Sequence, residues 1–138
     1  NLDDKSFKIS QALHTYFSVS HISEVAIKGL DKKPYLDALT WKNETQNGDI
    51  TFNQEVDRVY QEVDDEIVLS DKNRTLHIKN DGSSSVVVWN PWIEKTSRMS
   101  AMREDAYKQM LCIESANAFD DARVLEPQSS YTLKAVIF

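Results

Sequence analysis

Apolar and polar residues alternate in short runs along most of this chain, and turn-forming residues separate the runs. Alternation with a period of two is typical of strands that bury one face. The opening segment "SFKISQALHTYFSVS" is rich in β-branched and aromatic residues and predicts extended chain to Ser20. Further runs predict strands over residues 23–28, 66–70, 74–79, 85–90, 110–116 and 130–138. Many short strands with little helix predict an all-β protein, an antiparallel β-sandwich or barrel.

Turn sequences separate three of these strands in the middle of the chain. The segments "SDKN" (70–73) and "NDGSS" (80–84) are rich in residues that tolerate turn dihedral angles. They connect the strands at 66–70, 74–79 and 85–90, so these strands are predicted to form a short antiparallel meander.

The stretch from residue 31 to residue 60 carries weaker signals. "DKKPYLDAL" predicts a loop held by Pro34, and "WKNETQNGD" predicts a polar segment with a turn at its Asn-Gly pair. Residues 50–52 alternate and predict a short strand. The apolar residues of 56–60 fit either a strand or one helical turn, so this segment stays ambiguous.

Residues 97–109, "SRMSAMREDAYKQ", predict the one helix or helical turn. Met99, Met102 and Tyr107 fall on roughly one side of such a helix, and Ser97 can cap its start. A single short helix leaves the all-β prediction unchanged.

Composition narrows the class of protein. The 138 residues suit one domain, which we expect to span 1–138. The net charge is −6 and no dense basic run is present, which argues against a nucleic-acid partner. An anionic substrate would need a local basic pocket that works against this overall charge.

The chain has a single cysteine, Cys112, so an intrachain disulfide and a cysteine-rich metal site are excluded. No apolar run is long enough for a membrane-spanning helix, and the polar start "NLDDKSFKIS" does not resemble a secretory leader. These features lead us to expect a cytoplasmic protein without a membrane partner.

Three histidines, His14, His21 and His77, raise the question of a metal site. No two of them have the close spacing that places two imidazoles on one local face, so we expect no metal. His77 is expected on a strand surface and His21 in a loop or at an edge. His14 stands in "ALHTYF", where alternation puts it on the same face as Tyr16. It is either a partly buried histidine bonded to a backbone carbonyl or a functional group.

Glu114 is a carboxylate inside the apolar run "MLCIES". Alternation places it on one face with Met110 and Cys112. It either points to water from an edge, or lies in a dry pocket that raises its pKa and suits a general acid or base.

Two further segments offer groups that could bind a polyhydroxylated ligand. "VVVWNPW" (86–92) either plugs one end of a sandwich or forms an aromatic platform with Trp92, beside which Asn90 can donate and accept hydrogen bonds. In "EVDRVY", Asp57 and Arg58 are either an exposed pair or a ligand site in which Asp57 accepts from a hydroxyl.

The segments "ALHTYF", "EVDRVY", "VVVWNPW" and "LCIESA", in this order, resemble the C-terminal half of the hexose-6-phosphate mutarotases. These are glucose-6-phosphate 1-epimerases, in the aldose 1-epimerase superfamily. The resemblance covers essentially the whole chain, and "HTYF" and "WNPW" carry most of it. It implies the galactose mutarotase-like supersandwich, a large antiparallel β-sandwich of which this chain would be a C-terminal portion.

The resemblance also implies an activity. Family members interconvert the α and β anomers of a sugar phosphate without cofactor or metal. It places the catalytic acid at His14 and the catalytic base at Glu114, and it makes Asp57 a ligand of sugar hydroxyls. The aromatics near the site, Tyr16 and Trp92, would then stack on the apolar face of the sugar.

The chain departs from the family in its extent. Family members are longer at the N-terminus, and the arginines that hold the phosphate lie mostly in that portion. A half sandwich would leave apolar faces or strand edges open, so we expect it to form a homodimer, to bind its missing half or to be poorly soluble. A non-catalytic carbohydrate-binding β-sandwich and an inactive fragment remain alternatives, and the preferred hexose phosphate is open.

Overall fold

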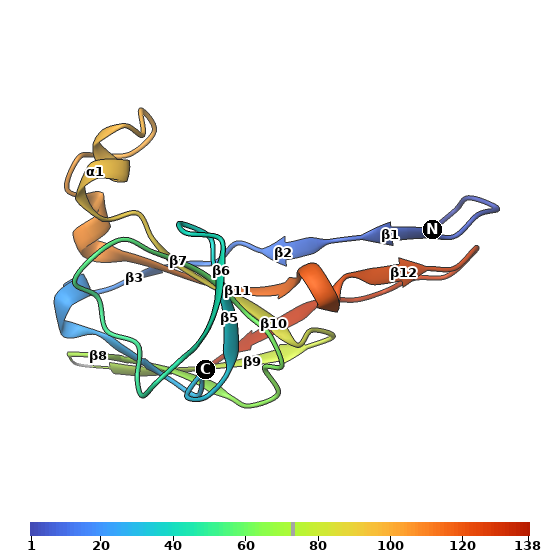
Figure 1. Ribbon diagram of the computed structural model, residues 1–138, viewed down its shortest axis with the longest axis horizontal. Coiled ribbons are helices and arrows are strands. Elements are labelled where there is room, and N and C mark those ends of the chain that lie inside the picture. Colours follow the sequence, from blue (N-terminus) through green and yellow to red (C-terminus); the bar gives the residue numbers. More distant parts are fainter. Residues whose placement is uncertain (73) are drawn as a thin grey trace.

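The computed structural model describes residues 1–72 and 74–138, and almost all of their regular structure is β-strand (Figure 1). These strands form a seven-stranded sheet, a four-stranded sheet and a two-stranded ribbon. All of the strand pairs within them run antiparallel. The expected antiparallel β-sandwich is therefore confirmed.

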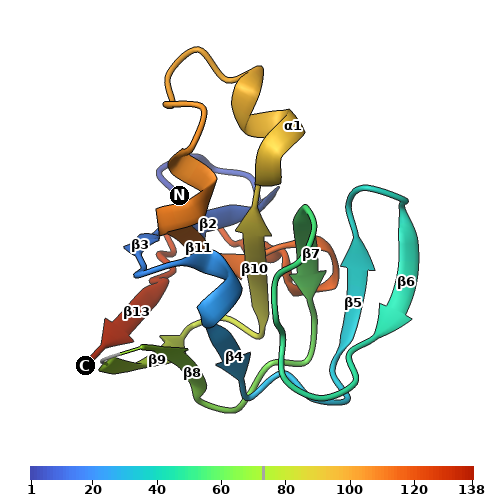
Figure 2. The same ribbon diagram turned by 90° about the vertical axis from the view of Figure 1, so that its left-hand side faces the viewer.

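The seven-stranded sheet carries Tyr16, Asp57, Asn90 and Glu114 among the residues singled out for function. Its strands pair in the order β2-β11-β10-β7-β5-β6, and β3 also pairs with β11. The bounds are β2 Gln11–Leu13, β3 Tyr16–Ser18, β5 Pro34–Asp37, β6 Lys42–Thr45, β7 Val56–Tyr60, β10 Ser85–Asn90 and β11 Met110–Asn117. Figure 2 shows β10, β7, β5 and β6 side by side. Strand β11 has neighbours on both edges and is buried at all of its residues, so a side chain on it starts from the interior of the protein.

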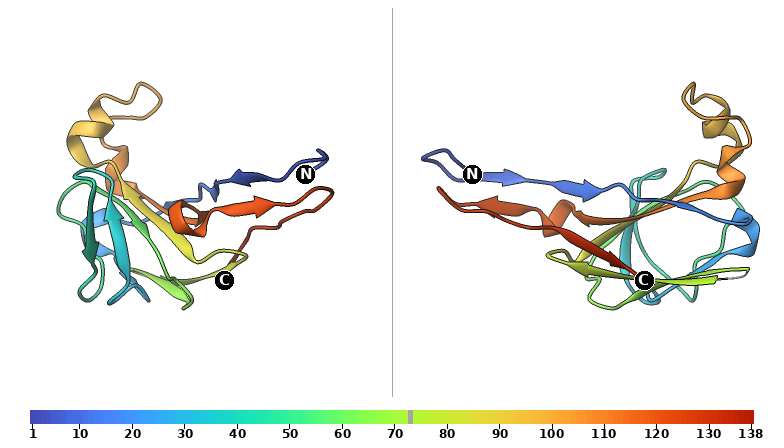
Figure 3. Two further views of the ribbon diagram at one scale, coloured as in Figure 1. Left: turned by 45° about the vertical axis from the view of Figure 1, so that its right-hand side comes forward. Right: turned by 180° about the vertical axis from the view of Figure 1, so that it is seen from behind.

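The other strands form the second layer and an arm. The four-stranded sheet has the order β13-β9-β8-β4. The bounds are β4 Ala26–Lys28, β8 Ile67–Asp71, β9 Arg74–Asp81 and β13 Lys134–Ile137. The ribbon pairs β1 (Phe7–Ile9) with β12 (Arg123–Leu125) and extends away from the two sheets (Figures 1 and 3).

One apolar core fills the space between the two larger sheets. Ile27 and Leu69 come from the four-stranded sheet, and Val88, Leu111 and Ile113 come from the seven-stranded sheet. All five side chains are buried in a single cluster. Burial of each such side chain contributes about 1.5–3 kcal/mol, so this core holds the seven-stranded sheet by one face. Its other face remains available for the polar residues described below.

Two segments that were expected to be loops are strands. The loop expected at "DKKPYLDAL" is wrong because β5 forms there, with Tyr35 buried in the core. The polar "WKNETQNGD" contains β6, all of whose residues are exposed. Strand β6 lies at the edge of the sheet, where polar residues are common, and a proline is tolerated as the first residue of a strand such as β5.

The ambiguous segment 56–60 is strand β7, and its helical alternative is wrong. The short strand expected at 50–52 is also wrong, because only Ile50 forms a bridge, to Ile27. Elsewhere the predicted strands agree within a few residues. The segment expected at 23–28 divides into the short 3₁₀-helix η1 (Ile22–Glu24) and β4. Within the predicted turn 70–73, Asn73 lies outside the described residues.

The helix expected over 97–109 is displaced. Helix α1 spans Trp92–Ser97, and the 3₁₀-helix η2 spans Ala106–Gln109, with turns between them. Helix α1 begins directly after Pro91, which is its N-cap residue. The remaining 3₁₀-helix, η3, spans Phe119–Asp121. In the part of the chain that the structure describes, every helix is too short or too polar to cross a membrane.

Candidate functional site

His14 lies opposite Glu114, at the break between β2 and β3, both of which pair with β11. Leu13 of β2 pairs with Ser115, and Tyr16 of β3 pairs with Cys112, so the same register runs through both segments. Residue 14 therefore faces residue 114. The strand is interrupted at this point by a tight turn in which the Thr15 amide donates to the Leu13 carbonyl over 2.8 Å. The turn leaves His14 outside the ladder with its side chain on the face of Glu114.

The two side chains are in contact. The Nε2 atom of His14 is 3.3 Å from the Oε1 atom of Glu114, and the side chains are 49% and 7% exposed respectively. Burial raises the pKa of Glu114, the His14 charge acts to lower it, and the nearby Asp57 carboxylate acts to raise it further. A buried carboxyl group with a raised pKa beside an accessible imidazole is an arrangement that can exchange protons with a ligand.

Aromatic side chains surround this pair. Tyr16 stacks on His14 with ring centroids 4.7 Å apart, and Trp89 meets His14 edge-on at 5.9 Å. Trp89 lies opposite Cys112 in the β10–β11 pairing, so both project from the same sheet face as Glu114. Tyr16 is 54% exposed, whereas Trp89 is buried. The site thus has one aromatic ring open to solvent and one that forms its wall.

Tyr16, Cys112 and Trp89 form a row of paired residues across three strands. Asp57 continues this row, because it lies opposite Trp89 in the β7–β10 pairing. Its Oδ2 atom is 3.4 Å from the Nζ atom of Lys95, which also lies 3.2 Å from Oε1 of Glu55. The Lys95 ammonium is 5.6 Å from the centroid of the Trp89 ring. Lys95 therefore ties Asp57 to helix α1 at one side of the site.

Cys112 forms the floor of the site. It is buried with Trp89 and Met110, and Met99 and Met102 pack against this group from the segment after α1. Burial raises the pKa of the Cys112 thiol to about 12, and the Glu114 charge adds to the shift. A ring nitrogen of His14, the Cys112 sulfur and a Glu114 carboxylate oxygen all lie within 4.8 Å of one another. These are the donors from which a metal ion could be held.

The expectation that Asn90 and Trp92 line the site is corrected. Asn90 is fully buried on the opposite face of the sheet, where its amide donates to the carbonyls of Tyr107 and Met110 and accepts from the Trp92 amide. Trp92 packs against Tyr107 with ring centroids 5.3 Å apart and joins the main core. Alternation along β10 explains the error: a face that carries Trp89 cannot also carry Asn90.

The other singled-out residues lie elsewhere. His21 caps η1 by accepting from the Ser23 amide, and His77 stacks on Phe138 on the four-stranded sheet. Arg58 projects to the other face of the sheet from Asp57, where its guanidinium donates to Gln46. These residues therefore do not contribute to the group around Glu114.

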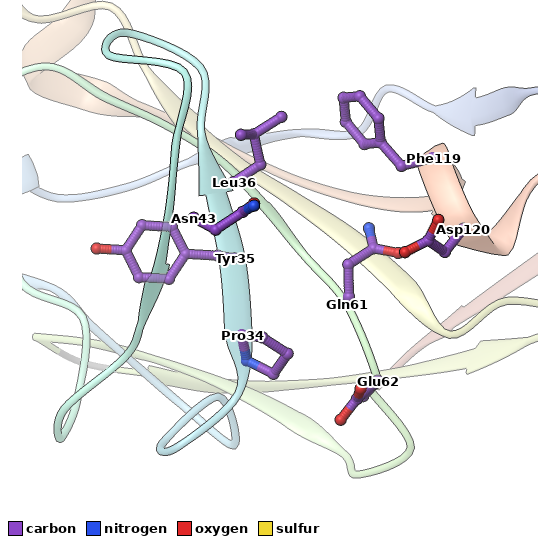
Figure 4. A pocket seen from close by; sticks show the side chains of 8 residues that line it. All are labelled: Pro34, Tyr35, Leu36, Asn43, Gln61, Glu62, Phe119 and Asp120. Atoms are coloured by element: carbon purple, nitrogen blue, oxygen red, sulfur yellow. The ribbon is translucent and has the colours of Figure 1, made fainter.

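A separate cavity lies on the same sheet face but far from this group. It has a volume of about 370 Å³ and lies between β5, the end of β7 and η3 (Figure 4). One row of paired residues crosses the sheet from this cavity to the site. Leu36 on the cavity wall pairs with Val59, Val59 pairs with Val87, and Val87 pairs with Glu114. Three strand spacings of about 4.8 Å separate Leu36 from Glu114, so one hexose cannot fill this cavity and touch Glu114 at once.

Sequence reasoning missed Trp89, Cys112 and Lys95 as parts of the site. The signal for the first two was the period of the strand that carries Glu114: Cys112 shares its face, and any residue paired with Cys112 must share it too. The pairing partner itself is not readable from one sequence. Lys95 enters from a helix, so no strand pattern marks it.

Comparisons with known proteins identify the family of this chain. The family model described as aldose 1-epimerase matches residues 1–137. The chain belongs to the aldose 1-epimerase family.

A protein of Cenchrus ciliaris named "Putative glucose-6-phosphate 1-epimerase" is 42% identical over 120 residues, which is 84% of this chain and 36% of that protein. A protein of Escherichia coli with the same name is 31% identical over 134 residues, 94% of this chain and 45% of that protein. The crystal structure of a "putative mutarotase" from Salmonella typhimurium superposes with a TM-score of 0.88 at 29% identity, over 96% of this chain and 46% of that one. This member of the aldose 1-epimerase family thus spans less than half the length of each of these relatives.

Proposed function

We propose that the protein interconverts the α and β anomers of a hexose 6-phosphate by general acid/base ring opening. The observation that carries the proposal is the 3.3 Å contact between His14 and Glu114 on one face of the sheet, beside an exposed aromatic ring. Membership of the aldose 1-epimerase family supports the reaction type. The names of the two curated relatives support a hexose 6-phosphate as the substrate.

Glu114 is the base and His14 the acid in this proposal. The Glu114 carboxylate takes the proton of the C1 hydroxyl while protonated His14 delivers a proton to the ring oxygen. The bond between C1 and the ring oxygen breaks and leaves an open-chain aldehyde. After rotation about C1–C2, the ring closes on the other face of the carbonyl and both protons return. Each positioned group supplies roughly 10²–10⁴-fold in rate.

The closeness of the two groups suits this chemistry. The C1 hydroxyl oxygen and the ring oxygen are bonded to the same carbon, so an acid and a base that serve them must lie near each other. A separation of 3.3 Å leaves no room for a whole sugar ring between His14 and Glu114. The sugar instead approaches from the solvent side with its anomeric carbon over the pair, and the half-exposed His14 side chain shifts to admit the two oxygens.

The surrounding residues have matching roles in the proposal. Tyr16 offers an exposed ring on which the apolar face of a sugar can stack, and Trp89 excludes water from one side of the carboxyl group. Asp57, held by Lys95, accepts from a sugar hydroxyl. The absence of a cofactor requirement, and pairing with a second copy or with the missing half, remain predictions.

The test is exchange between the anomers of glucose 6-phosphate, followed by NMR with the purified chain and its variants. Glu114→Gln keeps the size of the side chain and removes the base, so the exchange rate should fall by roughly 10²–10⁴-fold. Glu104→Gln is the matched control, because Glu104 is exposed and lies outside the site. Equal exchange in wild type and Glu114→Gln would show that Glu114 is not the base. Saturable sugar binding without accelerated exchange in the wild type would favour the non-catalytic carbohydrate-binding alternative.

A further inference from the structure

The proposed acid and base share their site with the only thiol of the chain, and this combination has a second chemical capacity. Cys112 is fully buried two residues before Glu114 on β11, and its sulfur lies on the side of the sheet where His14 meets Glu114. Imidazole nitrogen, thiolate sulfur and carboxylate oxygen are the three donor types that bind zinc in proteins. His14 is far from Cys112 and Glu114 in the chain, so the spacing of residues along the sequence does not reveal the group.

We propose that a thiophilic divalent cation such as Zn²⁺ binds to His14, Cys112 and Glu114 and thereby blocks the site. This inference deepens the proposed function, since it describes an inhibitory ligand of the proposed acid/base pair. The cation would be an inhibitor that occupies the site in competition with the sugar, and the anomer exchange itself would not use it.

The geometry is close to what a tetrahedral ion requires. With metal–ligand bonds of about 2.0–2.3 Å, neighbouring donors of a tetrahedral site lie about 3.3–3.8 Å apart. His14 Nε2 and Glu114 Oε1 are already 3.3 Å apart, and all three donor atoms lie within 4.8 Å of one another. Any donor pair that now lies farther apart than about 3.8 Å must close by up to about 1 Å to bind one ion. Three protein ligands leave the fourth position to water.

The charges around the donors are consistent with a cation. Asp57 acts on Glu114 as a nearby negative charge, and Lys95 is engaged by Glu55 and Asp57. Binding converts the Cys112 thiol to a thiolate and releases its proton to solvent, while His14 must be neutral. Once bound, the ion occupies the Glu114 lone pair that would accept the sugar proton and the His14 nitrogen that would donate one. Metal and proposed catalysis therefore exclude each other.

Cobalt(II) titration of the purified chain tests the site without reference to activity. A cobalt–thiolate bond gives a sulfur-to-metal charge-transfer band in the near ultraviolet, and because the chain has one cysteine, any such band reports Cys112. We expect the band in the wild type, its removal by EDTA or by excess Zn²⁺, and its absence in Cys112→Ser. Loss of a residue that contacts only a metal ligand costs about 10- to 100-fold in metal affinity. Because His14 would bind the metal directly, the affinity for cobalt should fall by more than this in His14→Gln. His77→Gln, whose histidine stacks on Phe138 away from the site, should bind cobalt like the wild type.

A second measurement connects the site to the reaction. Zn²⁺ should slow anomer exchange in the wild type, more glucose 6-phosphate should relieve the inhibition, and the ratio of rates with and without Zn²⁺ should move toward one in Cys112→Ser. The inference is overturned if saturating cobalt gives no thiolate band, or if the band forms with equal affinity in His14→Gln, with folding of each variant checked by near-ultraviolet circular dichroism. A chain that binds cobalt but does not accelerate exchange would refute the proposed function and leave the metal site standing. A chain whose exchange depends on Glu114 but that gives no cobalt band would refute the metal site and leave the proposed function standing.

Discussion

Glu114 and His14 face each other across adjacent strands, and only the glutamate is buried: its side chain is 7% exposed, against 49% for the histidine. The carboxyl group starts from a strand with neighbours on both edges, whereas the imidazole lies at a break between two short strands. The environment of Glu114 is therefore set by the protein, and that of His14 is shared with solvent. The pKa of Glu114 should therefore depend on the groups that the protein places beside it.

The pH profile of anomer exchange should reflect the charge of Asp57. The negative charge of Asp57 raises the pKa of Glu114, because two neighbouring carboxylates resist ionising together. In Asp57→Asn this repulsion is gone, so the pKa of Glu114 falls and its base form persists to lower pH. We expect the acidic limb of kcat/KM to move to lower pH in this variant, as measured by anomer exchange over a pH series.

Asp105→Asn provides the matched control for that measurement, since Asp105 is exposed and pairs with Arg103 outside the site. Its acidic limb should coincide with that of the wild type. An acidic limb that stays in place in Asp57→Asn would contradict the assignment of that limb to Glu114.

Glu114→Gln should make the protein more stable while it removes the base. Burial raises the pKa of Glu114 in the folded state, so the folded protein binds this proton more tightly than the unfolded chain does. The contribution of Glu114 to stability is fully present below the unfolded pKa of about 4.3 and is lost as the pH rises through the higher folded value. Glutamine keeps the uncharged state at every pH.

The stability gain of Glu114→Gln over wild type should therefore be small near pH 4 and grow toward pH 8, in urea unfolding followed by tryptophan fluorescence. Glu104→Gln, at an exposed position, should show no such trend. A gain that shrinks as the pH rises would mean that Glu114 is stabilised in its charged form, against the raised pKa.

Local alternation carried the predictions that succeeded. It placed Tyr16 on the face of His14, and the two rings stack; it placed Cys112 on the face of Glu114, and their donor atoms lie together. The relation between Cys112 and Glu114 holds within one strand, where the backbone alone decides which side a residue faces. His14 keeps the face of Tyr16 because the register against β11 is the same on both sides of the turn between β2 and β3.

Relations between strands explain the predictions that failed. Choosing Asn90 and Trp92 over Trp89 required knowing which face of β10 meets Glu114, and that depends on the pairing of Val87 with Glu114. The hairpin of β5 and β6 was missed because an exposed edge strand carries no apolar pattern. No single-strand signal contains the register that brings residue 14 opposite residue 114.

Asp121→Asn should destabilise the protein, because Asp121 anchors the end of the seven-stranded sheet. The buried carboxylate accepts from the Ser84 amide at 2.9 Å, the Ser84 hydroxyl at 2.7 Å and the Asn117 amide at 2.9 Å, and it pairs with Arg123. Burial acts to raise the pKa of Asp121, but these hydrogen bonds and the Arg123 charge hold it below its usual value. An asparagine turns an NH₂ group toward some of these donors and removes the charge, at a cost of roughly 2–4 kcal/mol.

The pH dependence of this cost has a definite sign. The stability that Asp121 contributes is present above the unfolded pKa of about 3.9 and is lost as the pH falls through the lower folded value. The gap between wild type and Asp121→Asn should be full at pH 7 and shrink on acidification, as measured by urea unfolding. Asp120→Asn, at the exposed neighbouring position, should change the free energy of unfolding little. A gap of the same size at all pH values would show that the charge of Asp121 does not matter.

Gly29→Ala should disrupt the contact between β4 and the start of β8. Gly29 has a φ of +92°, and a Cβ at this position would lie 2.2 Å from the Glu66 carbonyl oxygen. Gly48 has a φ of +72° with nothing within 4 Å of its Cβ position, so Gly48→Ala measures the cost of the backbone conformation alone. We expect about 1–2 kcal/mol for Gly48→Ala, and about 1–3 kcal/mol more for Gly29→Ala because backbone atoms cannot move aside as a side chain can. Urea unfolding of both variants gives the difference, and equal costs would mean that the two sheet segments separate at Gly29 without loss of core packing.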